Sequence, residues 1–179
     1  SLAFMVPLGL AQALTIKVAH AQGSGNPVEA RAFCLAGFKL ILMLGLMMSV
    51  AKIVFRHDIA MLFSSNINVQ LITANLFLFA AAWGVVDCLQ MTCSGALRGY
   101  KDTKVPLAIQ VIAFWVIAFP IAYSLALTDF WGPPLGVYGF WIGTVIATSI
   151  AAMCLMVRWN LVSKTEIRLA GQLQASSPK

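Results

Sequence analysis

Hydrophobic residues fall into five long runs along this chain, and short polar turns separate the runs. A helix needs about 20 mostly apolar residues to cross a membrane, because it rises about 1.5 Å per residue through roughly 30 Å of hydrocarbon. The runs cover residues 2–16, 32–55, 70–97, 105–127 and 135–157. The last two runs contain no charged residue, and the third contains only Asp87. This pattern predicts an all-α integral membrane protein with five transmembrane helices.

The connections between the runs are rich in residues that end helices. Residues 23–27 read Gly-Ser-Gly-Asn-Pro, in which Gly accepts positive φ and Pro cannot continue a helix. Residues 64–66, 99–103 and 132–134 are the other predicted turns, and none of the connections is long enough to form a soluble domain. Lys39 and Lys52 lie within the second run, each close enough to one end for its long side chain to reach the headgroups.

The composition excludes several classes of protein. Of the 179 residues, 60% are hydrophobic and 10% are charged, whereas ordinary soluble domains have about 45–50% and about 25%. A soluble enzyme, a nucleic-acid-binding module and a disordered tail are therefore excluded, and membrane lipid is the expected surrounding.

The basic residues predict how the chain is oriented in the membrane. The net charge is +6, and cytoplasmic loops are the ones that carry an excess of Lys and Arg. The turns after the first and third runs, together with the C-terminal end, carry nine basic residues: Lys17, Arg31, Arg98, Lys101, Lys104, Arg158, Lys164, Arg168 and Lys179. The opposite side carries Arg56, with Lys52 nearby. We expect a multi-pass protein of the cell (inner) membrane, with residues 159–179 as a cytoplasmic tail and the first residue outside. Five spans in this orientation suggest that at least one upstream helix precedes the chain.

Motifs of catalysis are absent from the sequence. The four cysteines lie in apolar runs without a Cys-x-x-Cys pair, which favours small buried side chains over a disulfide or metal site. The sequence contains no phosphate-binding loop, no Ser/His/Asp order and no zinc pattern. We therefore expect no enzyme activity and no cofactor, and any energy must come from an ion gradient or from another subunit.

Asp87 is the strongest candidate for chemistry. It lies eleven residues before Arg98, hence roughly 16 Å from the inner end of its helix. A carboxylate at this depth costs several kcal/mol unless it is paired, hydrated or protonated. At 3.6 residues per turn, Trp83, Asp87, Gln90, Ser94 and Arg98 share one polar stripe. The stripe indicates that the acid faces a cavity or another helix, as a proton or cation relay would require; an acid that only holds helices together is the alternative.

Small residues and prolines mark places where helices approach closely or bend. A small-xxx-small ridge is formed by Gly139, Gly143, Ala147 and Ala151. Gly95 and Gly99 form a second, shorter match, and Pro7 and Pro120 lie inside spans, where each removes a backbone hydrogen bond.

The segment Ser94–Pro106, with its Arg-Gly-Tyr-Lys-Asp run, closely resembles the segment after the tenth helix of multidrug and toxic compound extrusion (MATE) transporters of the NorM-like branch. Two further stretches are similar to the same family: residues 7–25, with Thr-Ile-Lys-Val and Gly-Ser-Gly, and residues 135–141, Leu-Gly-Val-Tyr-Gly-Phe-Trp. Asp87, followed by Gln90, stands where NorM-like members carry a membrane-embedded acid. The resemblance covers nearly the whole chain. Three residues depart from the pattern of relatives, namely Lys17, Ala19 and Trp83.

The resemblance implies that this chain corresponds to helices eight to twelve of a twelve-helix, two-lobe transporter with substrate held between the lobes. Helix seven and the whole N-terminal lobe would then be its missing partners. It also implies antiport of cationic, amphipathic drugs against Na⁺ or H⁺, with Asp87 as the residue that couples to the ion and the place for a Na⁺. The candidates to line the cleft are Trp83, Gln90, Ser94 and Met5. The family motif loop consists of Arg98, Gly99, Tyr100, Lys101 and Asp102.

Two other functions stay open at this point. A flippase of the same superfamily, for a lipid or polyisoprenoid-linked substrate, would call for several Arg or Lys at membrane depth. A non-transporting membrane scaffold subunit would have no need of an acid at mid-depth, so Asp87 argues against it.

Overall fold

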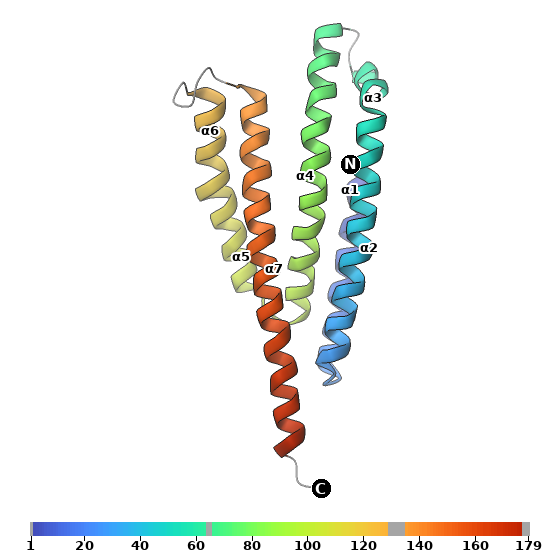
Figure 1. The fold of residues 1–179 in the computed structure, drawn as a ribbon, viewed down its shortest axis with the longest axis vertical. Coiled ribbons are helices and arrows are strands. Elements are labelled where there is room, and N and C mark those ends of the chain that lie inside the picture. Colours follow the sequence, from blue (N-terminus) through green and yellow to red (C-terminus); the bar gives the residue numbers. More distant parts are fainter. Residues whose placement is uncertain (1, 64–65, 129–134, 177–179) are drawn as a thin grey trace.

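A computed structural model of the chain describes residues 2–63, 66–128 and 135–176, and all the regular structure in these ranges is helical (Figure 1). The all-α prediction is therefore confirmed. In chain order the elements are α1 (Leu2–Gly23), α2 (Pro27–Val54), α3 (Arg56–Phe63), α4 (Ile67–Gly99), α5 (Lys104–Val111), the π-helix η1 (Ile112–Ala118), α6 (Phe119–Leu127) and α7 (Val137–Ser176).

The long helices run up and down in one elongated bundle, with α4 and α7 at its centre (Figure 1). Helices α1 and α2 pack on one side of α4, whereas α5, η1 and α6 pack on the far side of α7. The larger buried cluster joins α1, α2, α4 and α7 near the end where α4 stops, and it includes Val18, Cys34, Leu97 and Leu155. This end of the bundle is therefore the best packed part of the described chain.

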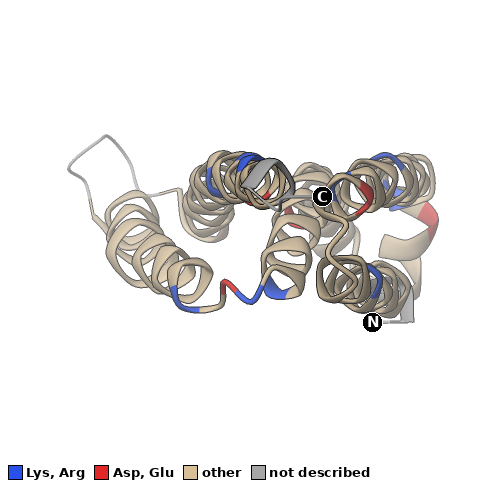
Figure 2. Cartoon of the chain, turned by 90° about the horizontal axis from the view of Figure 1, so that it is seen from below, with Lys and Arg blue, Asp and Glu red and all other residues tan. Residues whose placement is uncertain are grey.

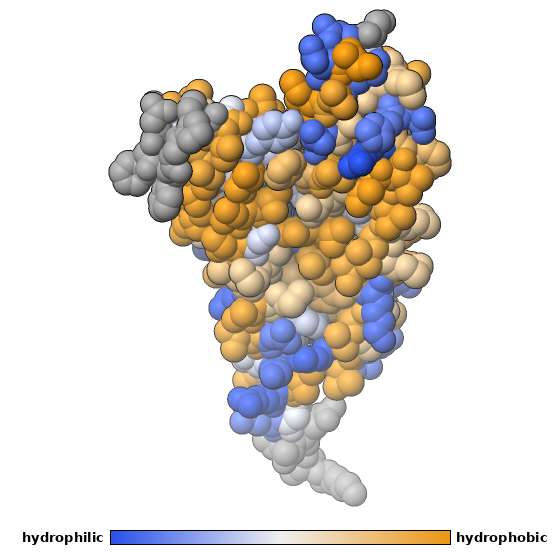
Figure 3. All heavy atoms as spheres, turned by 45° about the horizontal axis from the view of Figure 1, so that its top comes forward, coloured by the Kyte–Doolittle hydropathy of each residue, from blue (hydrophilic) through white to orange (hydrophobic). Residues whose placement is uncertain are grey.

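The outer surface of the bundle is strongly apolar. Four stretches are long and apolar enough to cross a membrane: Pro27–Val54, Ile67–Gly99, Lys104–Leu127 and Val137–Leu173. The 22-residue α1 packs beside two of them. Large side chains such as Trp115 and Leu127 are 72% and 71% exposed, and a broad hydrophobic band lies between hydrophilic ends (Figure 3). Exposed apolar surface of this extent fits contact with lipid acyl chains.

The two ends of α1 and α4 that lie on the same side of the bundle finish in the same way. After α1, Asn26 N–H donates to the Ala21 carbonyl (3.0 Å) and Gly25 adopts φ 74°. After α4, Asp102 N–H donates to the Leu97 carbonyl (3.0 Å) and Lys101 adopts φ 62°. Both are Schellman-type ends, in which the left-handed position is normally glycine. The predicted turns at 23–27 and 99–103 are therefore observed, and the second one carries a side chain where glycine would be relaxed.

Three features differ from simple expectation. Residues 56–63, which follow the second run, form the short helix α3. The span at 105–127 contains η1, in which Phe119 N–H donates to the Phe114 carbonyl, five residues back. Pro120 follows at once, and a widened turn accommodates its missing N–H and its bulky ring. The predicted tail continues α7 as a helix to Ser176, while residues 64–65 and 132–134 lie outside the described residues.

The glycines of the small-residue ridges lie where helices nearly touch. A Cβ built on Gly95 would lie 2.8 Å from the Ala11 carbonyl oxygen of α1. A Cβ on Gly143 would lie 2.8 Å from the Ala122 nitrogen of α6. Because backbone atoms are the neighbours in both cases, these positions exclude any side chain.

Candidate functional site

Asp87 lies on α4, twelve residues before the helix ends at Gly99. Its side chain is half-buried, and the adjoining Cys88 is buried against Gly45 of α2. The acid is therefore inside the candidate span Ile67–Gly99 and beside a helix–helix contact. The Asp87 carboxylate is therefore not fully enclosed by the neighbouring side chains.

Lys52 reaches toward this acid from α2. A Cβ built on Gly84 would lie 3.1 Å from Lys52 Nζ, which puts the ammonium against α4 one turn before Asp87. The ammonium is within electrostatic reach of the Asp87 carboxylate, but the two do not form an ion pair within 4.0 Å among the described residues. In this structure Lys52 therefore lies against α4 and is a neighbour of Asp87.

Trp83, the first residue of the polar stripe, connects α4 to α7. Its Nε1 donates to Thr148 Oγ1 at 3.3 Å, and its ring lies edge-on to Trp141 with centroids 6.4 Å apart. Thr148 is fully buried. Trp83 therefore holds α4 against α7, and its indole nitrogen is already engaged.

Gln90 and Ser94 are both buried, at 4% and 7% exposure. Gln90 Oε1 has no hydrogen-bond partner in the described part of the chain, which is costly for a buried amide oxygen and marks it as available to a ligand. Ser94 supports the end of the stripe, since Arg98 Nε donates to its carbonyl at 3.3 Å. Arg98 itself is exposed.

The stripe is thus divided along its length. Its middle, with Asp87 and Gln90, offers oxygen atoms that are not fully engaged, whereas Trp83 and Arg98 at its two ends make structural contacts. Met5 is 64% exposed on α1 and belongs to neither buried cluster. Among the described residues, no group of three or more His, Cys, Asp or Glu side chains could hold a metal ion.

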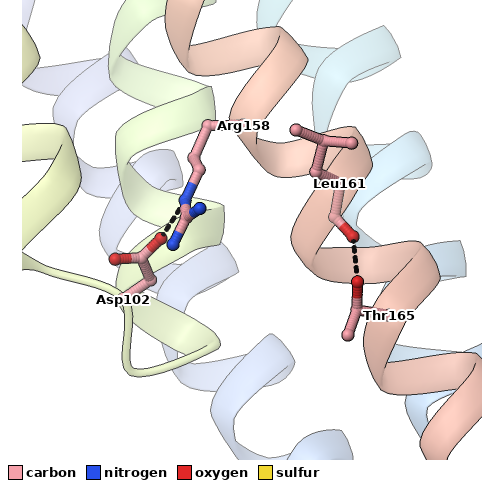
Figure 4. A network of polar contacts seen from close by, with 4 residues as sticks. All are labelled: Asp102, Arg158, Leu161 and Thr165. Atoms are coloured by element: carbon pink, nitrogen blue, oxygen red, sulfur yellow. Dashed lines mark hydrogen bonds and ion pairs between the residues drawn. The ribbon is translucent and has the colours of Figure 1, made fainter.

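The family motif loop forms a junction between helices. Gly99 lies against Val18 of α1, where a Cβ would come within 2.7 Å of it. Tyr100 is buried in the larger cluster, and burial raises the pKa of its phenol. Asp102 Oδ2 forms an ion pair with Arg158 Nε of α7 at 2.7 Å, and Figure 4 shows the two side chains. Gly99 therefore joins the end of α4 to α1, Asp102 joins it to α7, and Tyr100 packs among several helices.

A shallow groove of about 380 Å³ lies beside this junction. It is lined by Tyr100, Lys101, Asp102, Arg158, Leu161, Val162, Thr165 and Glu166. Viewed from this end, basic residues mark several helix ends (Figure 2). The groove is separated from Asp87 by the buried turns of α4 from Cys88 to Leu97, so it is not part of the acid's surroundings.

Sequence reasoning missed Lys52 as a neighbour of Asp87. A signal was present: Ile41, Gly45, Ser49 and Lys52 recur at helical spacing, and the first three are buried. Ser49 Oγ donates to the Ala81 carbonyl at 2.8 Å, which shows that this face meets α4. Lys52 continues the face by one turn.

Comparisons with known proteins agree on one family. A model of the MatE family matches residues 1–124. The multidrug resistance protein NorM of Photobacterium profundum is 35% identical over 176 residues, which are 97% of this chain and 39% of that protein. The chain therefore spans well under half the length of this relative.

Solved structures share the fold. A MATE transporter in the bent conformation has a TM-score of 0.84 and 20% identity over 95% of this chain and 36% of its own. The eukaryotic MATE transporter AtDTX14 has a TM-score of 0.80 and 21% identity over 94% of this chain and 38% of its own. The names of these relatives describe transporters and not enzymes.

Proposed function

This chain belongs to the MatE family, and we propose that it supplies most of one lobe of a multidrug efflux antiporter. The observation that carries the proposal is the half-buried Asp87 in a membrane-spanning helix, one turn from the unpartnered oxygen of Gln90. The relatives' names, which include a multidrug resistance protein, support the same activity.

The chemistry of these two side chains suits a small cation. A carboxylate and an amide oxygen are hard ligands of the kind that bind alkali and alkaline-earth ions. A carboxylate at membrane depth is also a natural proton acceptor, because the charged form is poorly solvated. We therefore propose that Na⁺ or H⁺ drives the exchange and that it binds at Asp87.

Coupling follows from the energy of the buried charge. When a cation or proton neutralises Asp87, the penalty for its burial falls, and helix arrangements that enclose the acid more tightly become more stable. A cationic, amphipathic drug would then lose its counter-charge and leave the cleft. The lobe supplied by the rest of the transporter would complete that cleft.

The setting of the protein is part of the proposal. We propose the cell (inner) membrane, with the basic ends of α1, α4 and α7 on the cytoplasmic side. Lys17, Arg31, Lys101 and Lys104 lie in or near the connections from α1 to α2 and from α4 to α5, which are at the same end of the bundle (Figure 1). An excess of basic residues is typical of the cytoplasmic side.

The test is Asp87→Asn in the protein that carries this chain together with its other lobe. Everted membrane vesicles expose the cytoplasmic face, so efflux would be followed as accumulation of ethidium inside them, driven by an outward Na⁺ gradient and, separately, by an outward H⁺ gradient. We expect gradient-driven efflux to fall at least tenfold with expression near that of the parent protein. Asp58→Asn is the matched control, because Asp58 lies on the exposed surface of α3. Undiminished efflux by Asp87→Asn under both gradients would contradict the assignment.

A further inference from the structure

The face of α2 that packs on α4 ends in a charged residue. Gly45 meets Cys88, Ser49 hydrogen-bonds to Ala81, and Lys52 follows at the next turn of the same face. A lysine that faced lipid would point away from the bundle, whereas Lys52 points toward α4. Lys39, on the same helix, is exposed and shows the alternative.

Room for the ammonium comes from Gly84. With a side chain of even one carbon at this position, the new Cβ would lie 3.1 Å from Lys52 Nζ and 3.7 Å from Ser49 Oγ. Gly84 therefore leaves open the space that the ammonium occupies against α4. The space is one helical turn from Asp87, which lies three residues further along.

We propose that Lys52 is the internal counter-cation of Asp87, which occupies the acid's surroundings while the ion site is empty and withdraws when a transported cation binds. The proposal rests on the function proposed above for Asp87. It adds a residue that sets how tightly the site holds its cations and how readily it releases them.

The role needs two positions for the Lys52 ammonium: the structure shows the one beside α4, and the place of Lys52 in α2 makes the other reachable. Its ammonium attracts the carboxylate from a distance greater than that of a direct ion pair, so little has to be broken when it leaves. Lys52 is also two residues from the end of α2 at Val54. A lysine stem at this place can turn its ammonium to the membrane interface without any movement of the backbone.

Competition between two cations has a defined consequence. While Lys52 faces Asp87, an incoming cation must displace a positive charge that is already there, so its observed affinity is lower than the affinity of the free carboxylate. Removal of the lysine charge removes this competitor. The cation then binds more tightly and dissociates more slowly, which hinders turnover.

The experiment is a double-mutant cycle on the protein that carries this chain with its other lobe, purified into phosphatidylethanolamine–phosphatidylglycerol nanodiscs. The probes are tetraphenylphosphonium and Na⁺, and their dissociation constants are measured by titration calorimetry. We expect Lys52→Met to bind the probes about tenfold more tightly than the parent protein in nanodiscs. Accumulation of ethidium in everted vesicles, measured separately at saturating substrate, should slow severalfold. Lys52→Arg retains the charge and should stay within about twofold of the parent. Lys39→Met is the matched control and should leave the affinity unchanged.

The role must act through Asp87. In the Asp87→Asn background, Lys52→Met should produce no further tightening of either probe. A tightening that persists there, or unchanged affinity in Lys52→Met when Asp87→Asn abolishes binding, overturns the role of Lys52 and leaves the proposed function standing. Full binding and efflux by Asp87→Asn would overturn the proposed function itself. Lys52→Gln, which removes the charge but keeps a polar side chain, provides the same comparison if Lys52→Met is not monodisperse.

Discussion

Replacement of Gly95 by alanine tests the contact between α1 and α4, which lies about two helical turns beyond Asp87. At this point the helices approach so closely that the Gly95 position faces the Ala11 carbonyl and the Thr15 hydroxyl. Thr15 Oγ1 donates to the Gly95 carbonyl at 2.9 Å, which ties the two backbones together. The substitution therefore challenges both the spacing and the hydrogen bond.

The magnitude can be worked from these contacts. The new Cβ would lie 2.8 Å from the Ala11 oxygen and 3.2 Å from Thr15 Oγ1, so α1 must move away. Overpacking of this kind costs about 1–3 kcal/mol, and the weakened interhelical hydrogen bond adds about 0.6 kcal/mol. The better helix propensity of alanine returns about 0.8–1 kcal/mol. We expect Gly95→Ala to lower the free energy of unfolding by about 1–3 kcal/mol.

The assay is unfolding of the purified transporter in mixed micelles with increasing SDS, followed by tryptophan fluorescence. Gly9→Ala on α1 is the matched control, because a Cβ there would meet nothing within 4 Å. That substitution should be neutral or should stabilise by up to about 1 kcal/mol. Equal stability of the Gly95→Ala and Gly9→Ala proteins would refute the close approach of α1 and α4.

Three further predictions concern the end of the bundle where α1 and α4 stop. Lys101→Gly should stabilise the folded protein by about 1 kcal/mol, because glycine adopts the left-handed φ of 62° without strain. Gly25→Ala should destabilise the protein by a similar amount, because alanine would be strained at φ 74°. SDS titration of the two variants would show opposite shifts. Asp102→Asn should cost about 0.5–1 kcal/mol, and a cycle with Arg158→Gln should show that the two substitutions are not additive, whereas additive losses would mean that the 2.7 Å ion pair contributes nothing. Tyr100→Phe should leave stability unchanged or raise it by up to about 1 kcal/mol, since the buried hydroxyl has no hydrogen-bond partner among the residues that the structure describes; a clear loss in the same titration would disprove this.

The apolar runs predicted the helices well because lipid imposes a strict demand on backbone hydrogen bonds, and only helices meet it within one segment. The ends of α1 and α4 could also be predicted from the sequence, since Gly and Pro act locally at residues 23–27 and at Gly99. Element type and turn position are therefore contained in short stretches of sequence. Neither requires knowledge of what packs against what.

Which helices pack against each other could not be predicted from such short stretches of sequence. Lys52 and Asp87 are 35 positions apart in the sequence, and only the packing of α2 on α4 brings them near each other. The π-helix was also not predictable, because Pro120 indicates a bend but does not distinguish a kink from a widened turn such as η1. Residues 159–176 contain charges such as Lys164 and Arg168, so the apolar run ends before them although the helix continues. No proline interrupts α7 up to Ser176.

The length of α7 has a mechanical consequence. Its 40 residues form a rod of about 60 Å, roughly twice the thickness of the hydrocarbon core, and it extends past the other helices (Figure 1). A tilt of about 5° around one end of such a rod displaces the other end by about 5 Å. A spectroscopic label near Leu173 would therefore act as a pointer that magnifies small reorientations of α7 inside the membrane into movements large enough to follow in real time.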